Sequence, residues 1–209
     1  MKIEGKRFGV FGASGCGKTF LSQRMIARKQ NVIVIDPKDE ISISGYTKIK
    51  SKKDFVFYLC ECEAKKKNIK IIISGVDCVT VGNFALTFVF EHKTAGTGEI
   101  TFFVDECQEF CPSGTARRDN YNPLLVVSRM GRSRGISLIV ASQRINTVDI
   151  NLRGNLNTLI LFRQGEYSDS QTVKRMIGVD LFNLPPREFY VKTDNGSVSH
   201  FKRAQDYIK

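Results

Sequence analysis

Histidine is scarce in this chain of 209 residues, which has only two, and the cysteines are not arranged in pairs. The six cysteines are scattered, and neither Cys60 and Cys62 nor Cys107 and Cys111 have the C-x-x-C spacing or the companion histidines of a zinc site. These absences exclude the common zinc-binding folds. We expect most of the cysteines to be small core residues in a reducing compartment, with no metal role.

Long apolar runs are also missing. No segment approaches the roughly 20 apolar residues of a membrane-spanning helix, and the N-terminus lacks the apolar core of a cleavable signal peptide. We therefore expect an intracellular protein with no transmembrane segment. Internal repeats, low-complexity segments and linkers are absent too, so residues 1–209 are expected to form one domain.

Acidic residues are too few to balance the basic ones, and the chain carries a formal net charge of +11. Self-repulsion of this size is only a cost unless a polyanion compensates it. The charge therefore predicts a polyanionic partner such as nucleic acid, since a bound nucleotide alone would not require so large an excess.

A glycine-rich loop follows the apolar run 8–11 and reads G-x-x-x-x-G-K-T, the Walker A pattern. Its glycines let consecutive backbone N–H groups point at one anion, and the helix expected over 18–28 adds the positive end of its dipole. Lys18 would reach the β- and γ-phosphates, and the Thr19 hydroxyl would ligate Mg²⁺. The predicted nucleotide-binding residues are Gly12, Ala13, Ser14, Gly15, Cys16, Gly17, Lys18, Thr19 and Phe20.

A second apolar run, 100–104, ends in Asp105 and Glu106, which is the Walker B pattern. Asp105 would hold Mg²⁺, and Glu106 would activate the attacking water as the general base. Together with Walker A, this pair predicts a site for ATP and Mg²⁺. A kinase acting on a small molecule needs no water-activating glutamate, whereas a hydrolytic motor does, so the pair favours an ATPase.

Strand and helix patterns alternate along the chain. Strands are expected over 7–11, 31–36, 70–74, 100–104, 136–141 and 158–162, and helices over 18–28, 54–67, 84–92, 122–130 and 168–176. The tail, 189–192 and 198–201 around Asn195-Gly196, is predicted to be a β-hairpin. This order predicts an α/β fold with a mostly parallel sheet flanked by helices, and with ligands at the carboxyl ends of the strands.

The strand expected over 136–141 is followed by Gln143 and preceded by an arginine-rich segment. A polar side chain at the end of this strand could contact the γ-phosphate or its attacking water, and Gln143 is the candidate for such a sensor. Arg129, Arg132 and Arg134 would suit either contacts to a DNA backbone or an arginine finger given to a neighbouring subunit's ATP.

Four segments together resemble the FtsK–HerA superfamily of DNA-pumping ATPases: Walker A, Walker B, the D-P-K-D-E element at 36–40, and 131–144 with its arginines and S-Q-R ending. The later segments 157–162 and 169–172 are similar to FtsK-type motors. The resemblance implies a RecA-like (ASCE) P-loop NTPase in which the sensor strand lies between the Walker A and Walker B strands. It also implies a homo-oligomeric ring, pentameric or hexameric. In that ring Arg132 would complete the adjacent subunit's site, with Arg134 and Arg129 as weaker candidates.

A motor domain of this size looks like the genome-packaging ATPases of icosahedral viruses with an internal membrane. The expected function is therefore ATP-driven translocation of double-stranded DNA into a preformed capsid, with capsid-vertex or virion-membrane proteins as further partners. The expected location is cytoplasmic: the host cytoplasm, or the virion vertex. The loop 113–120, with Arg117 and Arg118, is the candidate for gripping DNA phosphates, because a motor needs contacts that are independent of base sequence.

Three other functions stay open at this point. A cellular or plasmid DNA translocase of the HerA or FtsK type would share every motif named above. A P-loop kinase for a small molecule or nucleotide would suit the phosphate loop and the chain length, although Glu106 and the basic charge argue against it. The third is a nucleic-acid-binding switch in which ATP only sets the conformation.

Overall fold

The computed structural model describes residues 6–93, 98–119 and 121–208. Within these ranges, nine strands form one sheet in the order β3-β4-β2-β5-β6-β1-β7-β8-β9. Their bounds are β1 (Arg7–Phe11), β2 (Asn31–Asp36), β3 (Thr47–Ile49), β4 (Lys70–Ser74), β5 (Ile100–Val104), β6 (Ile136–Ser142), β7 (Thr158–Phe162), β8 (Phe189–Thr193) and β9 (Val198–Phe201).

The strands from β3 to β7 in this order pair in parallel, and the hairpin of β8 and β9 adds antiparallel strands at one edge. The sensor strand β6 lies between the Walker A strand β1 and the Walker B strand β5. This is the order that the resemblance implied, and it confirms the predicted mostly parallel α/β fold with a C-terminal hairpin.

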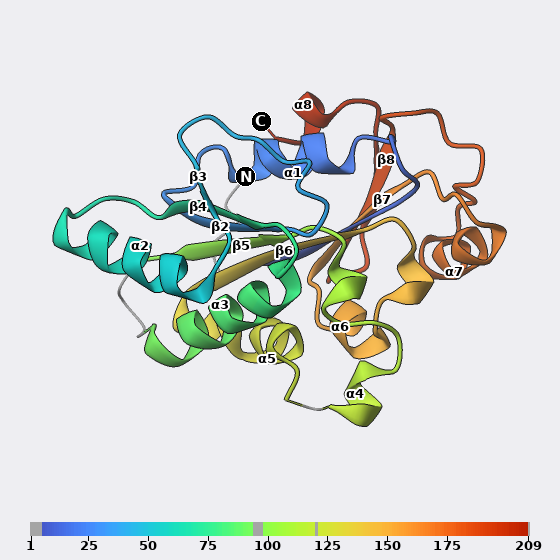
Figure 1. Ribbon diagram of the computed structural model, residues 1–209. Helices are drawn as coiled ribbons and strands as arrows, with labels where there is room; N and C mark the ends of the chain where they lie inside the picture. Colours follow the sequence, from blue (N-terminus) through green and yellow to red (C-terminus); the bar gives the residue numbers. More distant parts are fainter. Residues whose placement is uncertain (1–5, 94–97, 120, 209) are drawn as a thin grey trace.

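Helices cover both faces of the sheet (Figure 1). The α-helices are α1 (Lys18–Ile26), α2 (Lys52–Ala64), α3 (Cys78–His92), α4 (Thr115–Arg118), α5 (Pro123–Met130), α6 (Ile150–Gly154), α7 (Tyr167–Ile177) and α8 (Ala204–Tyr207), and short 3-10 helices are η1 (Cys107–Glu109), η2 (Gly131–Arg134) and η3 (Ile145–Thr147). Helices α1 and α8 lie on one face, whereas α2, α3 and α5 lie on the other (Figure 1). No helix in the described part of the chain is both long and apolar enough to cross a membrane.

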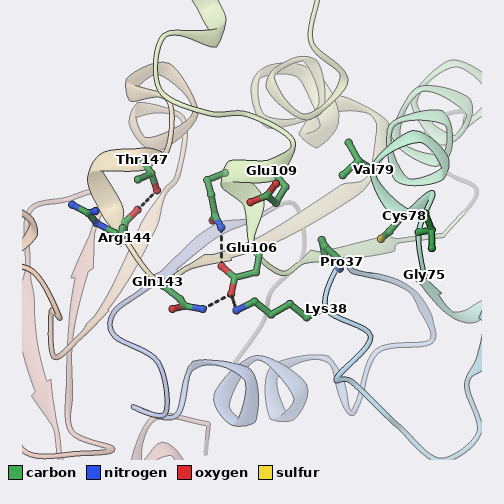
Figure 2. A pocket seen from close by; sticks show the side chains of 12 residues that line it. Pro37, Lys38, Gly75, Cys78, Val79, Glu106, Glu109, Gln143, Arg144 and Thr147 are labelled. Carbon is green, nitrogen blue, oxygen red and sulfur yellow. Dashed lines mark hydrogen bonds and ion pairs between the residues drawn. The ribbon is translucent and has the colours of Figure 1, made fainter.

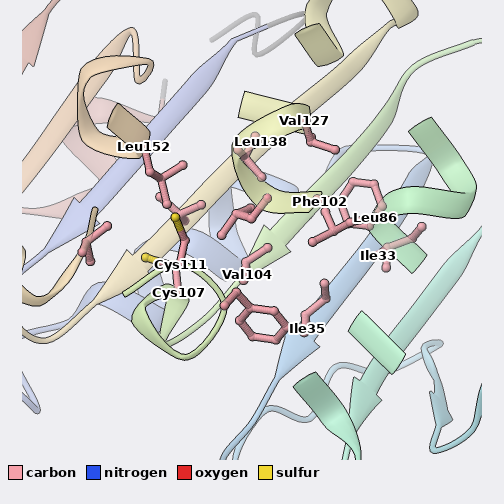
Figure 3. Packing of buried hydrophobic residues seen from close by; sticks show 14 of the residues in the cluster. Ile33, Ile35, Leu86, Phe102, Val104, Cys107, Cys111, Val127, Leu138 and Leu152 are labelled. Carbon is pink, nitrogen blue, oxygen red and sulfur yellow. The ribbon is translucent and has the colours of Figure 1, made fainter. Parts of the chain in front are cut away.

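The sheet separates two apolar cores, because alternate residues of each strand point to opposite faces. In β2, Ile33 and Ile35 join the larger core under α2, α3 and α5, whereas Val32 and Val34 join the core under α1. Cys107 and Cys111 lie inside the larger core (Figure 3). All six cysteines are free thiols, and they are buried as expected except for Cys60, which is exposed.

The structure differs from the sequence predictions mainly in short or irregular elements. Strand β3 and helices α4, α6 and α8 were not predicted, and all are three to five residues long, too short to show a period. Helix α3 begins at Cys78, six residues before the predicted start at 84. The β-branched residues and Gly82 at its beginning conceal the helical pattern. Gly82 is required there by packing, because a Cβ atom would lie 2.9 Å from Ile35 and 2.8 Å from Phe110.

Candidate functional site

The phosphate loop connects β1 to α1 at the carboxyl end of the sheet. Gly12, Gly15 and Gly17 have φ angles of 154°, 71° and 109°, which residues with a side chain rarely adopt. A Cβ atom at Gly12 would also lie 2.6 Å from Phe162 Cβ. The loop needs glycine both for its curled backbone and for its close approach to β7.

Lys18 is the first residue of α1 and is only 7% exposed. Its ammonium donates to the carbonyls of Gly12 and Ala13, at 2.8 and 2.9 Å. These bonds hold the charge against the loop, at the place where Walker A chemistry puts the β- and γ-phosphates.

A cavity of about 230 Å³ opens beside the loop, and the motifs that are far apart in the sequence meet in its wall. Its lining residues are Ser14, Gly15, Gly17, Lys18, Thr19, Phe20, Lys38, Glu40, Asp105, Glu106 and Gln143. Strands β1, β6 and β5 are adjacent and parallel, so their carboxyl ends lie at the same edge of the sheet. We call this space the nucleotide cavity.

Asp105 and Thr19 both line the nucleotide cavity, and a carboxylate with a hydroxyl is a donor set that fits a hard cation such as Mg²⁺. No group of three His, Cys, Asp or Glu that could hold a metal occurs among the described residues. A cation here would therefore share its remaining ligands with nucleotide phosphates. Burial raises the pKa of Asp105 to about 6 and outweighs the opposing effect of the Lys18 ammonium.

Glu106 is held in one position by its backbone and by three partners. Its φ of 44° and ψ of 51° are left-handed, a conformation that is uncommon for a residue with a side chain. Its carboxylate accepts hydrogen bonds from Gln143 Nε2 at 2.7 Å and Gln108 Nε2 at 2.8 Å, and it forms an ion pair with Lys38 (Figure 2). Burial acts to raise the pKa of Glu106, but the bonds from Lys38 and the two glutamines outweigh it and lower the pKa below its ordinary value.

The segment after the sensor strand is tied to α7. Arg144 Nε donates to Asp169 Oδ2 at 3.0 Å, and the backbone N–H of Asn146 donates to Asp169 Oδ1 at 3.0 Å. Asp169 is 1% exposed, so these bonds anchor the segment to a buried point. A displacement of Gln143 would therefore be transmitted to α7 as well as to Glu106.

A second cavity, of about 450 Å³, adjoins the phosphate loop at Gly15 and Gly17. Phe20 borders both cavities and is 55% exposed, and the Arg24 guanidinium lies 5.0 Å from the centroid of its ring. The remaining aromatic and cationic walls are Phe162, Arg187, Phe189 and Arg203. Phe162 and Phe189 are buried, so among these rings it is Phe20 that offers an open face on which a nucleobase can stack, beside the guanidinium planes. We call this space the base cavity.

The three arginines before the sensor strand lie at the opposite end of β6 from Gln143. A strand of seven residues spans about 20 Å, so none of them is near its own chain's nucleotide cavity. Arg129 and Arg132 are exposed. Arg134 lies over the Phe90 ring, 4.3 Å from its centroid, and donates to the Phe90 carbonyl, which gives it a structural role at the end of α3.

Arg117 and Arg118 lie on α4, a short helix where the sequence predicted a loop. Both are exposed, and Asn120, at the end of the predicted loop, lies outside the described residues. Asp149 Oδ2 accepts a hydrogen bond from the backbone N–H of Ala116 at 3.0 Å, and Ser113 N–H donates to the Thr147 carbonyl at 2.8 Å. The arginine-bearing segment is thereby joined to the chain just beyond Gln143.

Sequence reasoning missed the partners of Glu106 and the base cavity. In the sequence, Lys38 stands out only as part of the D-P-K-D-E element, and Gln108 belongs to no motif. The available signal was position: Lys38 follows the carboxyl end of β2, and β2 is the parallel neighbour of β5. That neighbourhood becomes visible only once the strand order is known.

The sequence matches no protein-family model and no curated protein. Among solved structures, the chain is similar to the genome packaging NTPase B204 from Sulfolobus turreted icosahedral virus 2 in complex with AMPPCP, with a TM-score of 0.73 and 16% identity over 97% of this chain and 100% of that chain. It is also similar to the cytoplasmic domain of the type VII secretion ATPase EccC of Thermomonospora curvata, with a TM-score of 0.58 and 19% identity over 96% of this chain and 25% of that chain. At the level of the fold, these likenesses confirm the resemblance that the motifs indicated.

Proposed function

We propose that this protein is an ATP-hydrolysing motor that translocates double-stranded DNA and packages a viral genome into a preformed capsid. The observation that carries the proposal is the convergence of Lys18, Thr19, Asp105, Glu106 and Gln143 on one cavity. These residues supply a phosphate clamp, a cation site, a base and a sensor, which are the parts that ATP hydrolysis requires.

In the proposed reaction, the oxygen of a water bonds to the γ-phosphorus while the bond from that phosphorus to the β,γ-bridging oxygen breaks. Glu106 accepts the proton that the water loses, and Lys18 with the loop N–H groups holds the charge on the phosphates. Thr19 and Asp105 would hold Mg²⁺, which when bound neutralises charge on the phosphate oxygens. Arg132 of a neighbouring subunit would stabilise the transferring group, an effect worth on the order of 10³–10⁵ in rate.

Transmission of hydrolysis to DNA is proposed to pass through the segment that follows Gln143. Loss of the γ-phosphate would release Gln143, and the bonds at Thr147 and Asp149 would carry the movement to α4. Arg117 and Arg118 on α4 would contact backbone phosphates, which suits a motor that moves along any sequence.

Three observations support DNA packaging in particular. The net charge of +11 favours a polyanionic partner. The fold is similar to that of a viral genome packaging NTPase over nearly the whole of both chains. Arg132 of η2 is exposed and lies too far from its own cavity to act there, so a ring of five or six copies would give it a site. Capsid-vertex or virion-membrane proteins would dock that ring.

The test is ATP hydrolysis with and without duplex DNA, together with displacement of a triplex-forming strand as the readout of translocation. We expect DNA to accelerate turnover in the wild type, and Lys18→Ala and Glu106→Gln to abolish it, with Glu106→Gln still binding ATP. The double variant Arg117→Ala/Arg118→Ala should keep basal turnover and lose DNA stimulation with its salt dependence. Phosphate transfer to a small acceptor, or turnover that DNA never changes, would contradict the proposal.

A further inference from the structure

Lys38 lines both the nucleotide cavity and a neighbouring cavity. It follows the end of β2 after Pro37, and its side chain is 41% exposed. The neighbouring cavity, of about 530 Å³, is lined by Lys38, Glu106, Gln108, Gln143 and Arg144 among others (Figure 2). The exposed fraction and the space on both sides leave the four-carbon stem of Lys38 room to move.

The carboxylate of Glu106 does not depend on Lys38 alone. Gln108 donates to its Oε2 and Gln143 to its Oε1, from just beyond the carboxyl ends of β5 and β6. If the Lys38 ammonium left, both carboxylate oxygens would keep an amide donor, so no buried acceptor would lose all its bonds. The carboxylate would then have room on Oε1 for a water.

Lys18 and Lys38 both line the nucleotide cavity. Lys18 is fixed against the loop carbonyls, and Walker A chemistry puts the terminal phosphate of a nucleoside triphosphate next to it. Lys38 and Glu106 line the cavity from β2 and β5. A terminal phosphate carries about two negative charges against one on the carboxylate, and it would be placed within reach of the Lys38 ammonium.

We infer that Lys38 is a second phosphate-binding lysine, which exchanges its ion pair with Glu106 for the terminal phosphate when a triphosphate binds. The inference rests on the proposed function, because it takes the nucleotide cavity to be the ATP site. A diphosphate lacks this group, so Lys38 stays on Glu106 when ADP is bound. Lys38 thereby distinguishes ATP from ADP and frees the base only when there is a phosphate to attack.

The test compares the affinities of AMPPCP and ADP for Lys38→Met and for the matched control Lys48→Met. Lys48 forms an exposed ion pair with Asp39 in the same segment, so both variants remove one lysine charge from one ion pair. We expect Lys38→Met to bind AMPPCP on the order of tenfold to a hundredfold more weakly, as the loss of one charge-assisted bond predicts. ADP affinity should be unchanged in both variants, and Lys48→Met should behave as wild type. Equal affinity of Lys38→Met and wild type for AMPPCP would overturn the inference.

A double-mutant cycle with Glu106→Gln separates phosphate binding from a purely structural ion pair. Without the Glu106 carboxylate, Lys38 has no ion pair to break before it binds the phosphate. Glu106→Gln should therefore bind AMPPCP several-fold more tightly than wild type. In the Lys38→Met background the same substitution should give a smaller gain, because it then relieves only the repulsion between the carboxylate and the phosphates. The double variant contains neither partner of the ion pair, so no buried charge is left unpaired. If Glu106→Gln raised the affinity for AMPPCP equally in the wild type and in Lys38→Met, Lys38 would not exchange Glu106 for the phosphate. Because wild-type turnover with DNA is measured separately, the inference can fail while the proposed function stands.

Discussion

Asp105→Asn should stabilise the nucleotide-free protein while it abolishes hydrolysis. Burial raises the pKa of this carboxyl from its ordinary value of 3.8 to about 6. Ionising Asp105 therefore costs the folded state about 3 kcal/mol more than it costs the unfolded chain. The amide has the same shape and its oxygen can still accept the hydrogen bond that Glu106 N–H donates at 3.0 Å, so the substitution removes mainly the charge.

The expected gain depends on pH in a defined direction. Above about pH 6 the carboxylate is ionised in both states, so the full cost is present and Asp105→Asn should be more stable by up to about 3 kcal/mol. As the pH falls from 6 to 3.8 the folded state takes up the proton first, and the advantage should fade to zero below that range. At pH 7.5 the melting temperature should rise by up to about 10 °C for a chain of this length.

Thermal unfolding at pH 7.5 and pH 4, with Asp149→Asn as the matched control, measures this difference. Burial acts to raise the pKa of Asp149, but hydrogen bonds from Ala116 and Asn151 N–H groups lower it, so this amide substitution should destabilise the protein. ATP with Mg²⁺ should reduce the difference in melting temperature between Asp105→Asn and wild type, because only the wild type offers the cation a carboxylate at position 105. An Asp105→Asn protein that is no more stable than wild type at pH 7.5, or that keeps its advantage at pH 4, would refute the electrostatic argument.

Other perturbations test the remaining parts of the proposal. Arg132→Ala subunits mixed into wild type should reduce turnover more than in proportion to their share, and a strictly proportional loss would count against a finger acting between subunits. Asp149→Ala should keep basal turnover within about twofold but lose DNA stimulation, because α4 loses its bond at Ala116. Unchanged stimulation would mean that this contact does not couple the site to DNA. Phe20→Ala should raise KM for ATP about fivefold with little change in kcat if its ring stacks on the base. A change confined to kcat would exclude stacking as its role.

The regular part of the fold could be predicted from the sequence because its signals are local. The strands from β1 to β7, apart from β3, are buried on both faces and read as continuous apolar runs. Strand β3 has only three residues, two of them exposed, so it has neither a run nor an alternation. The start of α3 was missed because Gly82, a poor helix former, is there to let the helix approach Ile35 and Phe110.

The candidate site was predictable where one motif supplies both a residue and its position. Walker A and Walker B fix Lys18 and Asp105 by spacing alone, and the adjacent strands then bring them together. The environment of Glu106 was not predictable, since Lys38 is 68 positions away in the sequence and Gln143 is 37 positions away. The base cavity likewise combines Phe20 on α1 with Arg187 and Arg203 from the last part of the chain.

In the proposed ring, strand β6 connects two nucleotide sites. Just before its first residue lies η2, whose Arg132 would act on the neighbouring subunit's ATP. Just after its last residue comes Gln143, which donates a hydrogen bond to Glu106, the proposed general base of the same subunit. All seven residues of β6 are buried, and parallel strands pair with it on both sides, so it cannot bend or slip without breaking the sheet. A rigid strand moves as a unit with the subunit. If a subunit rotates when it hydrolyses its own ATP, its Arg132 would therefore move in the nucleotide site of the next subunit. This coupling would make the subunits of the proposed ring hydrolyse ATP in sequence.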